Sequence, residues 1–373
     1  MLALTPTRLF TGSEMLDGHT VHIREGQIVD VTKRTSAGAI AVDGLLAPGF
    51  IDVQVNGGGG VLFNNQQSVD VLRTIASAHA RFGVTGFMAT LISDDRTRIV
   101  RAIDAVTQAI ESGTQALLGL HLEGPWLSAS RRGVHPSAHL RPVDEDDIRL
   151  LTQKRSFPIL VTVAPEQVDV ETIRTFRSAG VIVSLGHTEA PAELVEAALS
   201  AGATGFTHLF NAMPPLEGRK PGPVGAALAN RDCWAGLILD GIHVSPISAR
   251  AAFAAKTARR LMLVSDAMAT IGSENALMSL FGEAIEVRDG ALRTAGGTLA
   301  GAHLDLSAAV RNAVSLLGAT PAEALQMASL APAEFLGVAS TRGRVDVGCR
   351  ADLVLLDEGL NAKATWIAGK QAS

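Results

Sequence analysis

The sequence predicts an α/β fold, a (β/α)8 barrel to which the two chain ends add a small β domain. Three observations carry that prediction. Short apolar runs alternate with amphipathic helical stretches, eight such runs can be counted, and both ends of the chain have a β pattern of their own. Strands that alternate with helices are typical of a parallel sheet, and eight units favour its closure into a barrel. A doubly wound open sheet is the alternative, but it usually has fewer units.

The expected barrel strands are short and apolar, because parallel strands are buried on both faces. They cover residues 49–55, 84–90, 117–123, 158–164, 181–187, 204–208, 234–240 and 261–266. Helical periodicity lies between most of them, for example over 68–82, 97–112 and 191–201. After the last strand, the Asp289-Gly290 pair predicts a hairpin within 279–299, and helices are expected over 302–317 and 321–330.

The two ends of the chain alternate apolar and polar residues around turns such as Glu25-Gly26. Two short β segments bury little surface separately, so pairing them is the economical arrangement. We therefore expect residues 1–47 and 338–373 to form one small β domain, and residues 48–337 to form the barrel.

Composition excludes several classes of protein. The chain has 373 residues, of which 47% are hydrophobic and 18% charged, which suits a large folded core. Its formal net charge of −5 argues against nucleic acid as a partner, because phosphate backbones require a basic surface. The two cysteines, Cys233 and Cys349, are far apart, and no apolar run approaches the ~18 residues of a membrane span. With no signal-peptide pattern at the N-terminus, we expect a cytoplasmic protein without a membrane partner.

Polar residues stand at the ends of the expected strands, where barrels of this kind carry their chemistry. Glu123, His187, His208 and Asp266 end the third, fifth, sixth and eighth strands, and Asn211, Asp240 and His243 follow close to strand ends. Two imidazoles and one carboxylate suit zinc or ferrous iron, with a position left open for water. Asp266 would then be free to take the proton of that water and to return it to a leaving group.

Each of these residues also has a structural explanation. A single histidine at a strand end is more often a hydrogen-bonded structural residue, Asp266 could cap a helix, and Glu123 could bind turn amides. Four suitable groups on four strand ends in one layer are harder to explain in that way. We therefore predict a metal site, provided that the barrel is correct.

Several runs of residues resemble a known family. They include H-L-E-G-P at 121–125, S-L-G-H-T at 184–188, T-H-L-F-N-A-M at 207–213, V-S-D-A at 264–267 and G-G-T-L-A-G at 296–301. Together they resemble the N-acetylglucosamine-6-phosphate deacetylases of the amidohydrolase superfamily, over nearly the whole chain. The resemblance implies a TIM-like barrel, a small β-sandwich from both termini, and hydrolysis of the acetamide of N-acetylglucosamine 6-phosphate to glucosamine 6-phosphate and acetate, in amino-sugar catabolism.

The resemblance also implies roles for individual residues. The metal ligands correspond to Glu123, His187 and His208, and the catalytic aspartate to Asp266, with His135 polarising the substrate carbonyl. It further implies a homodimer, because in relatives the histidine at His243 reaches the ligand of the neighbouring subunit. The implied substrate contacts are Val134, His135, Asn211, Ala212, Arg219, Asp240, His243, Leu299, Ala300 and Gly301.

The first strand departs from the superfamily pattern. Most amidohydrolases end this strand with His-x-His, which holds a second metal, whereas this chain has Gln54 and Asn56. Amides are poor metal ligands beside imidazoles, so a second site there should be weak or empty. We therefore expect one divalent metal per subunit, zinc before iron.

Three other hypotheses remain open. The chain could be a sister deacetylase for N-acetylgalactosamine 6-phosphate, because one hydroxyl orientation depends on loop geometry. It could be a different amidohydrolase, such as a cyclic amidase, although the fourth strand lacks the lysine often found there. It could be a non-catalytic scaffold, which the intact strand-end residues disfavour. Arg219 and Lys220 could lie on a solvated loop, and His121 could belong to the core.

Overall fold

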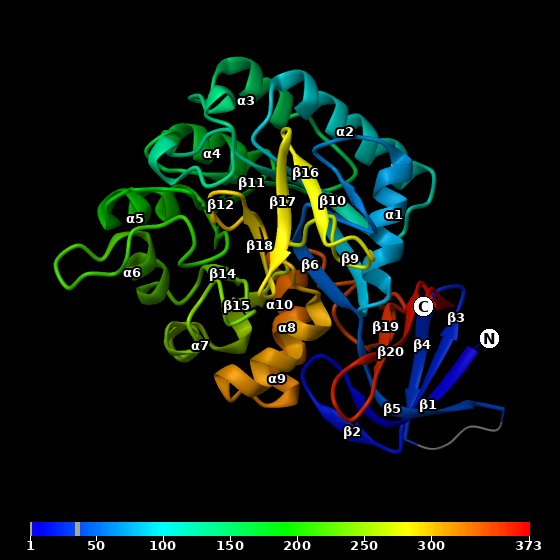
Figure 1. Ribbon diagram of the computed structural model, residues 1–373. Helices are drawn as coiled ribbons and strands as arrows, with labels where there is room; N and C mark the ends of the chain where they lie inside the picture. Colours follow the sequence, from blue (N-terminus) through cyan, green and yellow to red (C-terminus); the bar gives the residue numbers. More distant parts are fainter. Residues whose placement is uncertain (1, 34–37) are drawn as a thin grey trace.

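The barrel is the main body of a computed structural model that describes residues 2–33 and 38–373. Within these residues, eight parallel strands form one sheet in the order β15-β14-β13-β12-β11-β10-β9-β6 (Figure 1). Every expected strand is present, and the α/β barrel is confirmed. The strands are β6 (Phe50–Val55), β9 (Val84–Ile92), β10 (Leu117–Glu123), β11 (Ile159–Val163), β12 (Ile182–Leu185), β13 (Gly205–Phe206), β14 (Trp234–Leu237) and β15 (Leu261–Leu263).

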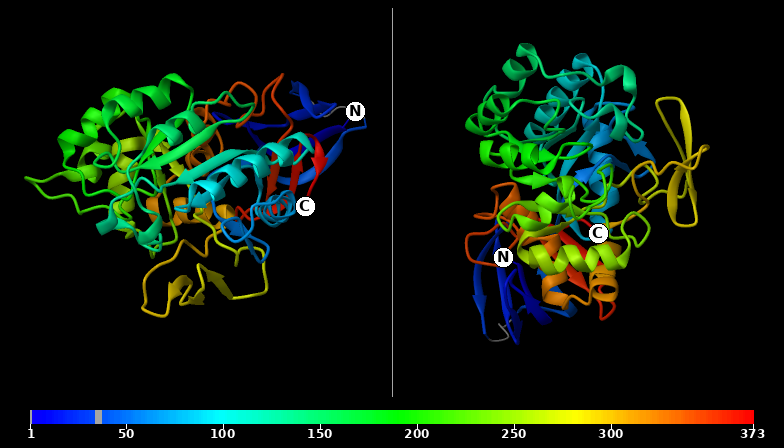
Figure 2. Two further views of the ribbon diagram at one scale, coloured as in Figure 1. Left: turned by 90° about the horizontal axis from the view of Figure 1, so that it is seen from above. Right: turned by 90° about the vertical axis from the view of Figure 1, so that its left-hand side faces the viewer.

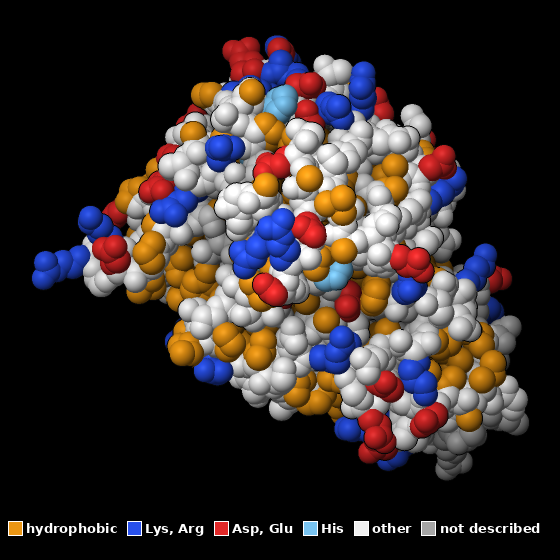
Figure 3. Space-filling model, viewed as in Figure 1, with side chains coloured by type: hydrophobic (Ala, Val, Ile, Leu, Met, Phe, Trp, Pro, Cys, Tyr) orange, Lys and Arg blue, Asp and Glu red, His pale blue; other side chains and the backbone are white. Residues whose placement is uncertain are grey.

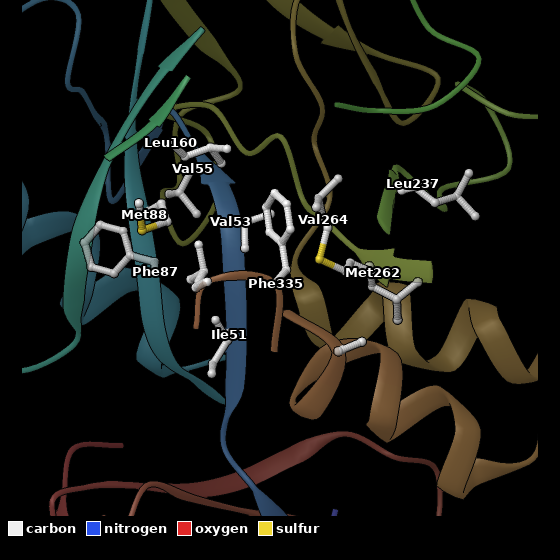
Figure 4. Packing of buried hydrophobic residues seen from close by; sticks show 14 of the residues in the cluster. Ile51, Val53, Val55, Phe87, Met88, Leu160, Leu237, Met262, Val264 and Phe335 are labelled. Carbon is white, nitrogen blue, oxygen red and sulfur yellow. The ribbon is translucent and has the colours of Figure 1, made fainter. Parts of the chain in front are cut away.

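The first and last strands, β6 and β15, are the two edges of this sheet, and they meet just beyond β15. The backbone N–H groups of Asn56 and Gly57 both donate to the carbonyl of Ala267, at 2.9 and 3.0 Å. Apolar side chains of both edge strands, such as Val53 and Met262, fill the space between them (Figure 4). The barrel is therefore nearly closed, and its seam lies between residues 54–57 and 265–267.

Several strands end earlier than their apolar runs predict. His187, His208 and Asp266 have φ values of 48°, 32° and 48°, in the left-handed region that non-glycine residues rarely adopt. These residues cannot continue a strand, so β12, β13 and β15 end before them. Such backbone strain tends to cluster at functional sites.

The helices surround the sheet, and their starts follow the expected capping chemistry. Ser68 and Asp95 accept backbone N–H groups at the starts of α1 and α2. The helix expected over 302–317 begins late, at Leu306, because Asp305 caps it there. The helices are α1 (Val69–Ala80), α2 (Arg96–Glu111), α3 (Glu145–Leu151), α4 (Val170–Ser178), α5 (Ala192–Ala201), α6 (Gly222–Ala229), α7 (Pro246–Arg260), α8 (Leu306–Asn312) with a π-helical turn over Ala313–Leu317, α9 (Pro321–Ala328) and α10 (Leu330–Phe335).

A second sheet takes strands from both ends of the chain, which lie side by side in Figure 1. Its order is β21-β20-β19-β5-β1-β3-β4, with β2 paired to β1, and its buried residues, such as Leu4 and Trp366, form a core of their own. The exact boundaries at 47/48 and 337/338 stay a prediction. The strands are β1 (Leu2–Phe10), β2 (Met15–Asp17), β3 (Thr20–Arg24), β4 (Gln27–Thr32), β5 (Ile40–Pro48), β19 (Leu353–Leu356), β20 (Ala362–Ile367) and β21 (Lys370–Gln371).

A small antiparallel sheet stands out from the barrel beyond β15 (Figure 2). It consists of β16 (Leu277–Leu280), β17 (Glu283–Arg288) and β18 (Ala291–Thr294), and the turn between the last two is the predicted Asp289-Gly290 pair. Met278 and Ile285 of this sheet pack with Met268, close to the mouth of the barrel. A two-stranded ribbon, β7 (Gly57–Gly58) and β8 (Val61–Leu62), follows β6. None of the described helices is long and apolar enough to cross a membrane.

Candidate metal centre

Glu123, His187 and His208 converge at the mouth of the barrel, although they come from the ends of three different strands. Glu123 Oε1 lies 3.2 Å from His187 Nε2 and 2.9 Å from His208 Nε2, and the two imidazole nitrogens are 3.0 Å apart. A tetrahedral ion with ligands at ~2.0–2.1 Å would require atoms ~3.3 Å apart. The three atoms therefore fit the coordination sphere of one zinc-like ion.

The atoms around this triangle are arranged for metal ligands. His187 Nδ1 donates to the backbone carbonyl of Arg131 at 2.7 Å, which leaves a lone pair on Nε2. The Glu123 side chain is fully buried, and burial alone would raise its pKa. The imidazoles of His187 and His208, whose Nε2 atoms face Glu123 Oε1, outweigh that effect and hold the pKa of Glu123 well below its usual value. Glu123 is therefore held as a carboxylate.

His135 is a competitor for the third ligand position. Ligand atoms of Glu123, His135 and His187 lie within 4.8 Å of one another. The set with His208 is tighter, since its longest separation is 3.2 Å. Burial, followed by the nearby His187, lowers the pKa of His135 to about 3, so its ring is neutral. The tighter set is the better candidate for the metal ligands.

Asp266 lies next to the triangle and is held by two amides of the first strand. Gln54 Nε2 donates to Asp266 Oδ1 at 3.1 Å and to Glu123 Oε1 at 3.1 Å, and Asn56 Nδ2 donates to Asp266 Oδ1 at 2.7 Å. If either amide were turned over, its carbonyl oxygen would face a carboxylate oxygen and repel it. The amide nitrogens of Gln54 and Asn56 are therefore the atoms that face the carboxylates. Both amides bind the same carboxylate oxygen, so neither one binds Oδ2.

Burial raises the pKa of Asp266 to about 7, and the charge of Glu123 adds to the rise. A carboxyl group with a pKa near neutrality can both accept and release a proton at physiological pH. The hydrogen bond from Asn56 opposes this rise only in part, because a neutral amide offers no full positive charge. The geometry and the pKa together make Asp266 a suitable acid/base.

These groups open into a cavity of about 370 Å³. Most of the substrate contacts expected from the sequence line this cavity. The positions of the expected strand ends could not by themselves show that these residues lie together. The expected contacts that line the cavity are Val134, His135, Asn211, Ala212, His243, Leu299 and Gly301, and they are joined there by Glu123, His187, His208 and Asp266.

Three expected contacts do not line the cavity. Ala300 is buried, and Asp240 lies behind His243, where its Oδ2 accepts from Nδ1 at 2.6 Å. Arg219 is exposed on the loop before α6, which projects from the molecule in Figures 1 and 3. Arg219 therefore does not reach the cavity of its own chain in this conformation.

Sequence reasoning missed other residues of the site. Ser93 follows β9 and contacts His135, and Arg131 both lines the cavity and supplies the carbonyl that orients His187. The strand-end rule could have found Ser93, because it follows a 9-residue apolar strand directly. Nothing in the sequence points to Arg131, whose main-chain oxygen makes the contact.

A nearly closed α/β barrel with a Glu/His/His triangle and a neighbouring aspartate at its mouth is typical of metal-dependent hydrolases. Residues 45–372 match the model of the amidohydrolase family. The chain belongs to the amidohydrolase family, and it is a metal-dependent amidohydrolase.

Individual relatives cover almost the whole chain. It is 41% identical to the N-acetylgalactosamine-6-phosphate deacetylase of Shewanella sp. (strain ANA-3), over 99% of this chain and 95% of the relative. It is 38% identical to the N-acetylglucosamine-6-phosphate deacetylase of Bos taurus, over 96% of this chain and 89% of the relative. The structure resembles a mutant N-acetyl-D-glucosamine-6-phosphate deacetylase from Mycobacterium smegmatis in complex with N-acetyl-D-glucosamine-6-phosphate, with a TM-score of 0.91, 32% identity, and coverage of 100% and 99%.

Proposed function

We propose that this amidohydrolase removes the acetyl group of N-acetyl-D-glucosamine 6-phosphate, giving D-glucosamine 6-phosphate and acetate. The observation that carries the proposal is the arrangement of Asp266 and His135 around the Glu123–His187–His208 triangle in one cavity. Relatives with this activity in their names, each matching most of the chain, support the substrate.

The reaction follows from groups that face the cavity. A divalent metal, when bound, would lower the pKa of a water molecule and polarise a carbonyl. Asp266 would accept the water's proton at Oδ2, because both amides bind Oδ1, and would then pass it to the leaving amine. His135 would donate to the carbonyl oxygen as negative charge develops there, a contribution often worth ~3–4 kcal/mol.

We propose that the ion is a single zinc per subunit, with iron as the second choice. Two imidazoles and one carboxylate are borderline donors that suit zinc, and their spacing supports one ion. Gln54 and Asn56 turn amide hydrogens toward Asp266, so the atoms that they present to this carboxylate are hydrogen-bond donors rather than ligands for a second ion.

We further propose a cytoplasmic homodimer. His243 lines the cavity of its own chain, so a role in the neighbouring subunit is not required for it. Arg219 is the better candidate for such a role, because its projecting loop cannot serve the chain's own cavity in this conformation. A guanidinium from a second copy would suit the substrate phosphate.

N-acetyl-D-galactosamine 6-phosphate is the second candidate substrate. The observation that favours it is the 41% identity to a deacetylase named for that sugar. The two sugars differ in the orientation of one hydroxyl group, which the cavity's lining must distinguish. Both substrates would use the same metal centre and the same acid/base.

The test is a comparison of kcat/KM for the two 6-phosphates, with unphosphorylated N-acetylglucosamine as the control, in zinc-loaded enzyme. We expect the gluco 6-phosphate to be the better substrate and the unphosphorylated sugar to be much poorer. A preference for the galacto epimer would replace the proposed substrate with the second candidate. Equal kcat/KM values with and without the phosphate group would mean that the enzyme does not recognise this group.

A further inference from the structure

Ser93, which directly follows β9, makes two contacts with the ring of His135. Its backbone N–H donates to His135 Nδ1 at 3.2 Å, and its hydroxyl oxygen lies 2.8 Å from the same nitrogen. Ser93 and His135 are 1% and 2% exposed, so water cannot easily replace either contact. The serine therefore decides what His135 Nδ1 can do.

A backbone N–H can only donate, so His135 Nδ1 must accept with a lone pair. A neutral imidazole carries one hydrogen, and that hydrogen must then reside on Nε2. An Nε2–H group can donate to an oxygen but has no lone pair for a metal. In this tautomer His135 is a hydrogen-bond donor and cannot be a ligand.

His187 shows the opposite arrangement in the same cavity. A backbone carbonyl, that of Arg131, accepts from its Nδ1, so its Nε2 keeps the lone pair that a metal needs. The rings of His135 and His187 are neighbours, with centroids 4.5 Å apart. A main-chain N–H thus makes His135 Nε2 a hydrogen-bond donor, whereas a main-chain carbonyl leaves the Nε2 of the adjacent His187 free to bind a metal.

We propose that Ser93 is a positioning residue that holds His135 as an Nε2–H donor and keeps it out of the metal's coordination sphere. The inference rests on the proposed deacetylation only for the identity of the oxygen that receives this hydrogen bond. The tautomer itself follows from the contacts. A histidine free to choose its tautomer would compete with His208 for the metal.

The surroundings of Ser93 are shaped for this contact. A Cβ atom at Gly124 would lie 2.2 Å from the Ser93 hydroxyl oxygen, so the glycine beside the ligand Glu123 leaves room for the serine. Asn64 binds both the N–H and the carbonyl of Ile92, at 3.0 and 3.1 Å. This side chain fixes the end of β9 and leaves the next N–H, that of Ser93, directed at His135.

The first measurement is the tautomer of His135, by ¹⁵N NMR of zinc-loaded protein labelled at histidine. The His135 signals are assigned by their loss in His135→Gln. We expect Nδ1 to show the shift of an unprotonated nitrogen and Nε2 that of a protonated one. An Nδ1–H tautomer, or an Nε2 bound to the metal, would overturn the proposal. This readout needs no substrate, so it stands even if the proposed deacetylation fails.

The second measurement is kinetic, because Ser93→Ala removes the hydroxyl but keeps the backbone donor. We expect kcat to fall ~10-fold, with KM and the bound zinc unchanged, and a minor population of the second tautomer in the NMR spectrum, because only the longer contact, that of the backbone N–H, still opposes it. Ser93→Thr, which keeps the hydroxyl, should restore most of kcat. Ser128→Ala is the matched control, since that hydroxyl contacts only Ser130 among the described residues. An unchanged kcat and spectrum in Ser93→Ala would exclude a positioning role for the side chain.

Discussion

The two sides of the barrel mouth hold negative charge by different means. On the side of β10, β12 and β13, Glu123 faces two imidazoles whose spacing suits a cation. On the side of the β6–β15 seam, Asp266 faces two neutral amides, Gln54 and Asn56. The metal side offers lone pairs to an ion, whereas the amide side offers hydrogens to an anion. A buried carboxylate can therefore be held in a barrel mouth by two neutral amide donors.

Removal of the carboxylate that the two amides hold should have the largest effect. Asp266→Asn keeps the shape and one acceptor oxygen, but it cannot take a proton from water. We expect kcat to fall about 10²–10⁴-fold, the usual range for the loss of a general acid/base. Zinc content should stay near that of the wild type. Full activity in this variant would exclude Asp266 as the acid/base.

On the metal side, removal of one proposed ligand should weaken the binding of zinc. His208→Ala deletes one corner of the triangle, and we expect zinc affinity to fall by more than ~100-fold because only two ligands remain. Metal analysis after dialysis should find about one zinc per chain in the wild type and almost none in the variant. Two tightly held ions in fully active wild-type enzyme would contradict the mononuclear proposal.

A variant of the amide side tests whether Asn56 positions the acid/base. Asn56→Leu keeps the approximate volume and removes the 2.7 Å donor to Asp266 Oδ1. We expect kcat to fall ~10–100-fold, as for other residues that orient a catalytic group, with zinc content unchanged. Asn361→Leu is the control, because that amide is exposed and binds Asp357, in the loop between β19 and β20. A loss of zinc in Asn56→Leu would mean that the amide side also supports the metal.

The smallest expected effect is the pH dependence of stability that the raised pKa of Asp266 should cause in the metal-free protein. The pKa of Asp266 is raised to about 7 in the folded chain, so its contribution to stability is present at acid pH and is lost as pH rises through 7. Without metal, Asp266→Asn should therefore be more stable than the wild type at pH 8 by about 1–3 kcal/mol, and the gap should close toward pH 4. Urea unfolding at both pH values measures this gap. A gap that widens toward acid pH would contradict the raised pKa.

The sequence predicts the metal side better than the amide side. Glu123, His187, His208 and Asp266 could be proposed because each stands where an apolar strand stops. Gln54 and Asn56 were recognised only as a departure from His-x-His. Their contact with Asp266 depends on the closing of the seam, which brings residues 54 and 266 together across 212 positions of the chain.

The fold could be predicted closely, because the periodicity of apolar residues and the capping residues of helices are local properties of the chain. The eight strands and the Asp289-Gly290 hairpin follow from such signals. The strand ends were less accurate, since left-handed φ values at His187, His208 and Asp266 are imposed by the site rather than by the residues themselves. Contacts made by the main chain, such as that of the Arg131 carbonyl, leave no mark on the choice of residue.

The seam of the barrel has a consequence for the order in which the enzyme is assembled. A growing chain has all three metal ligands once residue 208 has emerged, but Asp266 and the carbonyl of Ala267 arrive 58 positions later, at the seam that joins them to Gln54 and Asn56. A partly synthesised barrel would thus have the three proposed ligands without the proposed acid/base. Catalytic activity would therefore require that the residues after β15 have already docked against the end of β6.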